Sequence, residues 1–390
     1  TATITLTCTD NVGVVTNTLT SSSFTVSNSN MISIEGVTAT KVTNGYKYGL
    51  TVKGGSTNGN ATISVKAGSV ADNNGNKSAS VTSSNINVNN NVIVNFDHNY
   101  NILNENTSKW TFHGQSKVDS SNQYNGRTGV AVYSNAYQYT GIKIPILSTN
   151  YHQNVTYLLS GRFKKGANFT GTLKYYTPAY DSSNTVVNWN VIGITASNLS
   201  STWKLFQLKI SSSTYSIPSL LLLYDTANQG PTYISDIKLR EYATDTKQYK
   251  TAYGTLPTST RVGYTFAGWY TGETDGTKVA DTTTITNTNE HTLYGHWNAN
   301  TYTINYYTYD GKTKLGSSTH TYDSAKALTT MATLKGTAPN GKVTFYGWAT
   351  SANSTSRVYT DGQSVTNLTA TNGGTINLYA IYRSAGVTIT

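Results

Sequence analysis

The chain has 390 residues and a formal net charge of +10, and only 12% of its residues are charged. This length exceeds that of one ordinary domain, so we expect about two to four domains. The basic residues are spread thinly instead of forming a stripe, and no apolar run reaches about 18 residues, which argues against nucleic-acid binding and against membrane insertion.

Short runs of Thr, Val, Ile and Tyr alternate with polar residues between turns rich in Asn and Gly along the whole chain. Alternation of this kind is typical of β strands with one buried face. The sequence therefore predicts an all-β fold. The best candidate for a helix is Ser324–Leu334, which is long enough for about two or three turns.

Residues 1–90 carry short strand-like runs separated by Asn, Gly and Ser turns: Thr3–Thr9, Ser23–Ser27, Met31–Val37, Tyr46–Val52 and Ala61–Ala67. This spacing predicts a β-sandwich. The opening TLTCTDNVGVV and the closing VKAGSVADNNGNKS resemble bacterial immunoglobulin-like modules of cell-surface proteins, which implies a spacer domain. Asp10 and Asp72 either cap turns or hold Ca²⁺. The single cysteine, Cys8, is expected to be a buried apolar residue.

A second domain is expected over residues 91–242. Its most characteristic segments are TYLLSGRFKKG (Thr156–Gly166), Trp203-Lys204 at the start of a strand, and YISDI (Tyr233–Ile237). In this order they resemble the carbohydrate-binding modules of the CenC-like type, families four, nine and twenty-two. The resemblance implies a jelly-roll β-sandwich that binds a polysaccharide.

Flat aromatic rings match the apolar C–H faces of pyranose sugars, and this domain is rich in them. We predict that the following rings contact a glycan: Trp189, Tyr137, Tyr139, Tyr180, Trp110 and Tyr176. Trp189 lies between two asparagines, and Tyr137 and Tyr139 share one face of an extended segment. The alternative for each ring is packing in the core. Core packing is expected for three further rings: Trp203, Phe163 and Phe206.

The same resemblance implies a structural Ca²⁺ ion at the end of the sandwich where the first strand meets the last. Asp97 and Asp236 fall at the matching places, and Asn125 in the YNGRTG turn adds an oxygen. Hard oxygen ligands suit Ca²⁺. The alternative is that the two aspartates cap turns or pair with Lys or Arg.

The last third of the chain contains a near-repeat. Gly263–Trp297 and Val343–Tyr382 each have an aromatic strand ending in Gly-Trp and a closing Leu-Tyr strand. Both resemble the Listeria–Bacteroides repeat of internalin B-type surface proteins, which implies β-grasp-like modules over 243–299 and 300–390. Their tryptophans are expected to lie in the cores of these small modules: Trp269, Trp297 and Trp348.

The first copy of the repeat has no opening strand before Tyr249. Either Ile237–Tyr242 of the preceding domain takes its place, or the copy is truncated. In both cases we expect the first copy to pack closely on the preceding domain.

Catalysis is not expected, because the six histidines show no metal-ligand spacing and no Gly-x-Ser-x-Gly motif occurs. We interpret the chain, which opens without Met, as part of a longer protein. The main hypothesis is non-catalytic polysaccharide or surface-glycan binding by residues 91–242 in an extracellular protein, secreted or cell-wall attached, of a Gram-positive bacterium. The flanking modules would be spacers. The alternative is a structural adhesin stalk that binds a host protein or matrix.

Overall fold

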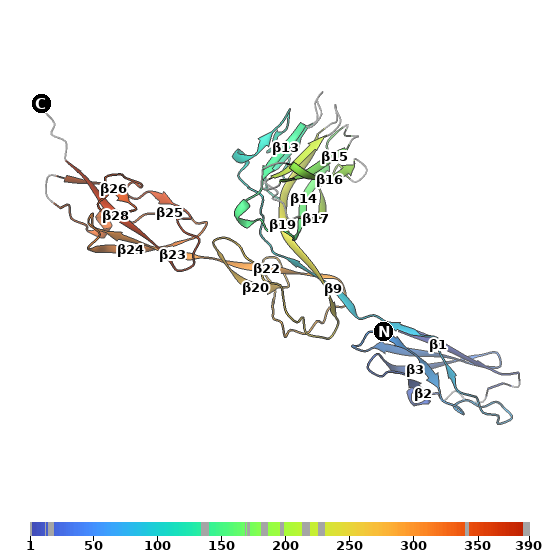
Figure 1. Ribbon diagram of the computed structural model, residues 1–390. Coiled ribbons are helices and arrows are strands. Elements are labelled where there is room, and N and C mark those ends of the chain that lie inside the picture. The colour runs from blue at the N-terminus through green and yellow to red at the C-terminus, as the bar shows by residue number, and fades with distance from the viewer. Residues whose placement is uncertain are drawn as a thin grey trace. The chain divides into compact units, whose positions relative to one another are not determined.

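The computed structural model describes residues 2–11, 13–14, 19–133, 140–167, 169, 172–180, 186–195, 199–212, 219–224, 231–339 and 343–384. In strands β15 (Thr172–Tyr180) and β16 (Val186–Thr195) it gives the backbone and its register but, apart from Lys174, no side chains. The described fold is all-β, as predicted (Figure 1). No helix in these ranges has the length and hydrophobicity needed to span a membrane.

The chain divides into two units, each made of several segments. The first comprises Thr1–Asn95, Thr244–Leu256 and Ala280–Thr292. The second comprises Phe96–Ala243, Pro257–Val279 and Leu293–Thr390. Three long strands contribute residues to both: β9 (Asn91–Asp97), β19 (Thr232–Gln248) and β22 (His291–Ala299).

The first unit contains two small sheets with the strand orders β1-β4-β3 and β2-β6-β7, together with the pair β5-β8. Its strands are β1 (Ala2–Thr9), β2 (Phe24–Val26), β3 (Ile32–Val42), β4 (Gly45–Gly54), β5 (Gly59–Ala61), β6 (Ile63–Val65), β7 (Val81–Thr82) and β8 (Ile86–Val88). The five predicted runs contain or overlap β1 to β6, whereas β7 and β8 were not predicted. Alternate residues such as Tyr48 and Leu50 fill the core, at 0% and 2% exposed. Cys8 is only half-buried, contrary to expectation. Asp72 accepts hydrogen bonds from the backbone of Asn74 and Asn76, which is turn capping.

The second unit contains a β-sandwich made of a five-stranded sheet, β10-β13-β18-β15-β16, and part of a larger one in which β14 pairs with both β17 and β19. The strands not yet given are β10 (Thr111–Phe112), β11 (Lys117–Val118), β12 (Gly129–Val132), β13 (Thr140–Pro145), β14 (Thr156–Lys165), β17 (Lys204–Ser211) and β18 (Ser219–Tyr224). Ile142 and Leu222 from one sheet and Leu159 and Phe163 from the other are 0% exposed and belong to one core. Alternation along each strand therefore puts one face of each sheet inside.

Phe163 and Phe206 pack in this core as predicted, with ring centroids 5.3 Å apart. Trp203 lies outside it, which corrects the prediction. Its half-exposed ring contacts Tyr124, and the ammonium of Lys164 lies 5.0 Å from its centre. The prediction relied on the apolar residues that follow Trp203 in the sequence, whereas Trp203 itself lies on the solvent side of the sheet.

The C-terminal repeat forms a four-stranded sheet of order β24-β23-β28-β26 with the pair β25-β27 beside it. Its elements are β23 (Thr301–Tyr307), β24 (Lys314–Thr321), β25 (Lys326–Ala327), α1 (Met331–Leu334), β26 (Val343–Ala349), β27 (Ser364–Val365) and β28 (Gly374–Ser384). The predicted helix is thus confined to its last four residues. Trp348 is fully buried, as predicted.

The larger sheet contains a matching order, β19-β9-β22-β20, followed by β21 (Lys278–Val279); β20 is Tyr264–Tyr270. In it, β9 takes the place that β23 takes in the C-terminal repeat. Alternating positions are buried in both strands: Val92, Val94 and Phe96 in β9, and Tyr302, Ile304 and Tyr306 in β23. The opening strand of the first repeat is therefore β9, which precedes the other sandwich strands in the sequence. This corrects both expected alternatives: the copy is not truncated, and Ile237–Tyr242 belongs to the neighbouring strand β19.

The first repeat packs on the sandwich within the second unit, as predicted. Trp297 lies half-buried against the sandwich core, and its Nε1 donates a hydrogen bond of 2.7 Å to the carbonyl oxygen of His98. The hydroxyl of Tyr100 donates to the carbonyl of Thr260 at 3.1 Å. Trp269, 1% exposed, is a core residue as predicted, whereas Trp297 is a docking residue instead.

The Gly-Trp motif has the same structural cause in both copies. Gly268 and Gly347 have φ of +120° and +147°, values that residues with a Cβ rarely adopt. Each lies where the register of its strand shifts against the neighbouring strand, so each forms a β-bulge. The bulge directs the following residue, Trp269 or Trp348, into the core.

Candidate functional site

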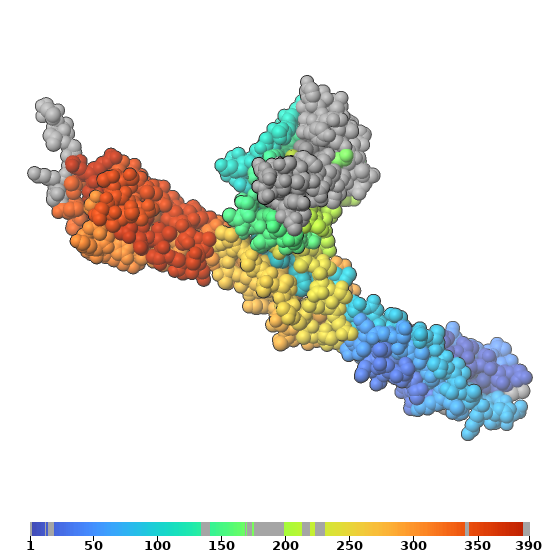
Figure 2. Space-filling view, in the orientation of Figure 1, coloured from blue at the N-terminus to red at the C-terminus, as the bar shows by residue number. Residues whose placement is uncertain are grey.

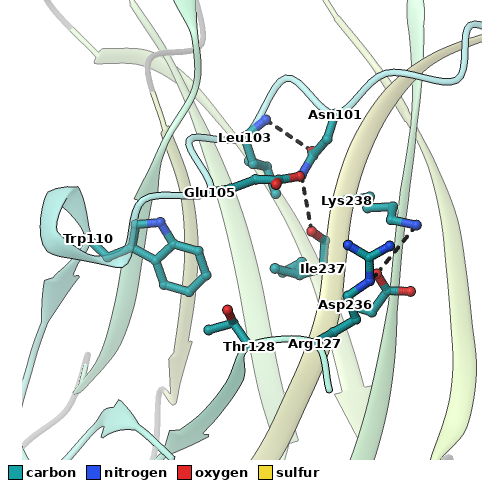
Figure 3. A pocket seen from close by; sticks show the side chains of 9 residues that line it. All are labelled: Asn101, Leu103, Glu105, Trp110, Arg127, Thr128, Asp236, Ile237 and Lys238. Atoms are coloured by element: carbon teal, nitrogen blue, oxygen red, sulfur yellow. Dashed lines mark hydrogen bonds and ion pairs between the residues drawn. The ribbon is translucent and has the colours of Figure 1, made fainter. Parts of the chain in front are cut away.

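A small open hollow with a volume of about 90 Å³ lies beside Trp110 (Figure 3). We call it the Trp110 pocket. Its lining combines one indole ring with polar and charged side chains: Asn101, Leu103, Glu105, Trp110, Arg127, Thr128, Asp236, Ile237 and Lys238. They come from the segment after β9, from the turn before β12 and from β19.

Trp110 is held by a short 3-10 turn, η2 (Thr107–Lys109). Asn106 caps this turn by accepting a hydrogen bond of 3.0 Å from the backbone N–H of Ser108. The indole Nε1 donates to the carbonyl oxygen of Asn104 at 2.5 Å, and the ring packs against the sandwich core beside Phe112. One edge of the ring is thus fixed while the half-buried ring lines the hollow.

Arg127 reaches the pocket from a tight hairpin turn. Asn125 and Gly126 have φ of +48° and +71°, and the backbone N–H of Arg127 donates to the carbonyl of Tyr124 at 2.9 Å. These are the features of a type I′ turn, for which Asn-Gly is the preferred sequence. The hydroxyl of Ser235 contacts the carbonyls of Arg127 and Thr128 and so fixes the turn to β19.

Asp236 lies at a bulge in β19, where the register against β14 shifts. Its φ of +52° is left-handed, which costs an ordinary residue about 1–2 kcal/mol. Such strain in a residue other than glycine is often found at functional sites. Here it places the carboxylate 3.4 Å from Nζ of Lys238 and 3.8 Å from Nε of Arg127.

The remaining polar groups of the pocket differ in how many of their hydrogen-bonding positions are already occupied by the protein. Asn101 uses both its oxygen and its nitrogen, since Oδ1 accepts from the N–H groups of Leu103 and Leu239 and Nδ2 donates to Glu105. The exposed side chains of Glu105 and Arg127 retain free hydrogen-bonding capacity towards solvent. Two cationic and two anionic side chains balance in charge, which favours an uncharged, hydroxyl-rich ligand.

The residues predicted to hold Ca²⁺ have other partners. Asp97, 3% exposed, lies 3.4 Å from the guanidinium of Arg240; its burial raises its pKa, an effect that Arg240 opposes. Asp236 faces Arg127 and Lys238, whose charges would repel a cation. The described residues contain no group of three His, Cys, Asp or Glu side chains suited to a metal. The donors do not fit Ca²⁺ as they stand, and the calcium site stays a prediction from the resemblance.

The outer face of the five-stranded sheet is a second candidate surface. Leu222 of β18 is buried and Leu221 is only half-buried, so the two mark opposite faces. The register places Tyr176 opposite Leu221, and Val191 opposite Tyr176. Directly paired residues share a face, and so do residues two apart along a strand. The positions of Tyr176 and Trp189 therefore belong to the outer face.

The other predicted rings cannot be placed in the same way. Tyr137 and Tyr139 lie outside the described residues. Tyr180 ends β15 just after a shift in register, so alternation does not carry over to it. Of the predicted rings, Trp110 is the one whose side chain the structure describes, and it lies in the pocket.

Sequence reasoning missed the polar lining of the pocket, above all Glu105, Arg127 and Lys238. The Asn-Gly pair at 125–126 was a usable signal, because it predicts a hairpin turn that presents the next residue. Nothing local marks Glu105 or Lys238, which reach the pocket only through the pairing of distant segments.

A partly buried cluster of His98, Glu241, His152 and Ser259 resembles a catalytic arrangement in composition alone. Ser259 Oγ and Glu241 both face Nδ1 of His98, the latter at 3.6 Å, so the imidazole cannot relay a proton from one to the other. Glu241 also binds Nδ1 of His152 at 2.6 Å. His98 is 2% exposed. The cluster is part of the docking of the first repeat.

Residues 227–296 match the family model of the Listeria-Bacteroides repeat domain. No match was found among curated proteins.

Among solved structures, the chain is similar to a CBM22-1 xylan-binding domain from Paenibacillus barcinonensis, with 19% identity, a TM-score of 0.29, and coverage of 37% of this chain and 92% of that one. It is also similar to a family 16 carbohydrate-binding module, with 20% identity, a TM-score of 0.27, and coverage of 36% and 99%. A family 11 module from Clostridium thermocellum, solved with a mixed-linked tetrasaccharide, gives 14% identity, a TM-score of 0.27, and coverage of 36% and 94%.

Proposed function

We propose that the sandwich of the second unit binds a polysaccharide without cleaving it. The observation that carries this proposal is the Trp110 pocket, an open hollow in which an indole ring lies beside carboxylate, guanidinium and hydroxyl groups. Small-molecule sites typically combine an apolar wall with a few polar groups that fix the orientation of the ligand.

In the proposed mechanism one sugar ring lies against the indole of Trp110. Its hydroxyls donate to the carboxylate of Glu105 and accept from Arg127 and Thr128. The balanced charges of the lining favour a neutral sugar. Because the pocket is open at the surface, the polymer can continue on both sides of the bound ring.

The outer face of the five-stranded sheet offers a second contact region for the same polymer. Tyr176 and Trp189 occupy positions on that face, which the exposed Lys143 shares. Aromatic and polar residues at such positions favour contact with extended sugar chains over burial in a core.

We place the protein outside the cell, at a bacterial surface, because residues 227–296 match the Listeria-Bacteroides repeat family and resemble repeats of surface proteins. In this setting the N-terminal module and the repeats hold the sandwich away from its point of attachment. Gram-positive origin and secretion belong to this proposal.

The test is affinity electrophoresis of the full chain in gels that contain soluble glucan, xylan or mannan. We expect retardation by at least one of them, and a weaker effect for Trp110→Ala and Arg127→Ala. Trp203→Ala is the matched control, since it removes a half-exposed tryptophan of the same sandwich outside the pocket.

Two results would oppose the proposal. If no polysaccharide retards the full chain, the alternative of a structural adhesin stalk gains support. If Trp203→Ala weakens retardation as much as Trp110→Ala does, the pocket is not the site. A thermal unfolding scan of each variant separates lost binding from lost folding, and Arg127→Ala, which removes an exposed side chain, provides a test that does not disturb the core.

A further inference from the structure

The C-terminal repeat, coloured orange to red in Figure 2, has a hollow of its own. Its volume is about 340 Å³. We call it the Tyr346 hollow; the lining residues that matter here are Tyr309, Tyr346, Thr355, Tyr382 and Arg383. It lies within the second unit and shares no residue with the Trp110 pocket.

Two arginines are stacked on the ring of Tyr346; Arg383 lines the hollow, and Arg357 is a neighbour through that ring and is not a lining residue. The central guanidinium carbon of Arg383 lies 3.2 Å from the ring centre of Tyr346, and that of Arg357 lies 4.0 Å from it. Arg357 also donates to the carbonyl oxygen of Tyr346 at 3.1 Å. Stacking holds a guanidinium flat and leaves the N–H groups at its edge available.

Neither arginine has a carboxylate partner among the described residues, and both side chains are exposed. The nearest acid in sequence to the lining, Asp310, accepts from the hydroxyl of Thr308 and lies 3.8 Å from Lys312. No Asp or Glu lines the hollow. The positive charge of the two guanidinium groups is therefore not balanced locally.

The tyrosine hydroxyls do not change this balance. Tyr309 donates to the carbonyl oxygen of Asn353 at 3.1 Å, and Tyr382 donates to that of Thr337 at 3.2 Å. Their protons are used, so the side-chain donors that the lining leaves to a ligand are those of Arg383, Tyr346 and Thr355, with the guanidinium of Arg357 stacked on Tyr346. The hollow thus combines aromatic walls with an excess of cationic donors.

We propose that the Tyr346 hollow binds an acidic polysaccharide through the carboxylate of a uronic acid residue. A guanidinium edge matches a carboxylate with two parallel N–H···O bonds, and such charge-assisted bonds are stronger than neutral ones. Tyr309 and Tyr382 supply apolar surface for the sugar ring, which a bare phosphate or an acidic peptide side chain would not use. This site is independent of the proposed neutral-sugar site on the sandwich.

The test is affinity electrophoresis of the full chain in gels with polygalacturonate, and with neutral dextran for comparison. Replacing both Arg357 and Arg383 by alanine should weaken polygalacturonate binding about tenfold or more, since each tenfold step corresponds to the loss of about one charge-assisted contact. The matched control is the pair Lys312→Ala and Lys314→Ala, which removes the same charge from exposed positions of the same repeat.

The variant Arg383→Lys separates geometry from charge, because it keeps the charge and loses the planar fork. We expect weaker binding than in the native chain and unchanged thermal unfolding. Equal losses for the arginine pair and the lysine pair would overturn the proposal in favour of general charge attraction. Absence of retardation by polygalacturonate, or stronger binding of polyglutamate or polyphosphate in competition, would also overturn it. Trp110→Ala should leave polygalacturonate binding unchanged, so the two sites can fail separately.

Discussion

Replacing Arg240 by alanine removes the cation that faces the buried Asp97 where the sandwich and the first repeat meet. Arg240 is 9% exposed and Asp97 is 3% exposed. The guanidinium lies 3.4 Å from Asp97 and 3.0 Å from Glu273, and it donates to Asn99 Oδ1 at 3.0 Å. The substitution therefore leaves a buried carboxylate without its counter-ion and loosens the contact with Glu273 of the repeat.

The size of the effect follows from burial and distance. Two unit charges 3.4 Å apart interact by about 5 kcal/mol at an effective dielectric constant of about 20. Removing one partner of a buried pair costs about 3–5 kcal/mol. We expect Arg240→Ala to lower the free energy of unfolding of the second unit by about 3–5 kcal/mol.

The loss in free energy of unfolding caused by Arg240→Ala should depend on pH. Burial already raises the pKa of Asp97, and the loss of Arg240 raises it further. A carboxyl with a raised pKa in the folded state destabilises that state when ionised, and this effect disappears as the pH falls through that pKa. The difference between Arg240→Ala and the native chain should therefore shrink on acidification. Adding Asp97→Asn to the variant should restore most of the lost stability at neutral pH.

Urea unfolding followed by tryptophan fluorescence measures this effect, because all six tryptophans belong to the second unit. Lys312→Ala is the control, since it removes one partner of an exposed ion pair in that unit. It should change the unfolding midpoint little. A loss for Arg240→Ala below about 1 kcal/mol, typical of surface pairs, would refute the reasoning, as would the failure of Asp97→Asn to restore stability.

Further substitutions test other parts of the structure. Gly347→Ala should destabilise more than Gly268→Ala in urea unfolding, because a Cβ at Gly347 meets a backbone oxygen at 2.4 Å whereas one at Gly268 meets a flexible lysine; equal effects would contradict this. Asn125→Ala should cost about 1 kcal/mol and Asn125→Gly should not, by thermal unfolding, since φ is positive there. Burial lowers the pKa of His98 below 6.5, so the folded protein is most stable above pH 6.5, where the imidazole is neutral, and loses stability as the pH falls below 6.5. His98→Asn should flatten this dependence of stability on pH. An unchanged pH profile would exclude His98 as its cause. If Ca²⁺ binds as the resemblance implies, EDTA should lower the midpoint of thermal unfolding, whereas the ion pairs of Asp236 predict no change.

Local pattern was enough to predict the all-β class and most strands of the first unit, but not the short strands β7 and β8. The alternation that puts Tyr48 and Leu50 in a core is a property of neighbouring residues. The burial of Trp269 and Trp348 could be predicted for the same reason, because a small module needs large buried rings.

The opening strand of the first repeat could not be found by reading outwards from Tyr249. Its place in the sheet belongs to β9, and strands β10 to β18 of the sandwich lie between β9 and β19 in sequence. The family match also starts only at residue 227, between β18 and β19, and so does not include β9. A pairing between segments so far apart is decided by the folded chain, and no local pattern records it.

The lining of the candidate site was likewise only partly predictable from local sequence. Trp110 was predicted from its residue type, but its polar neighbours were not. Arg127 reaches the pocket through an Asn-Gly turn, while Lys238 and Asp236 reach it through a bulge in β19. A bulge changes the side to which residues point, so alternation fails at the positions that line the pocket.

The most direct test of the central claim is a glycan array probed with the full chain and with Trp110→Ala. The account predicts that the native chain binds a defined set of neutral oligosaccharides, that Trp110→Ala loses this set, and that Trp203→Ala retains it. Binding to no glycan on the array, or an identical pattern for the native chain and Trp110→Ala, would contradict the account.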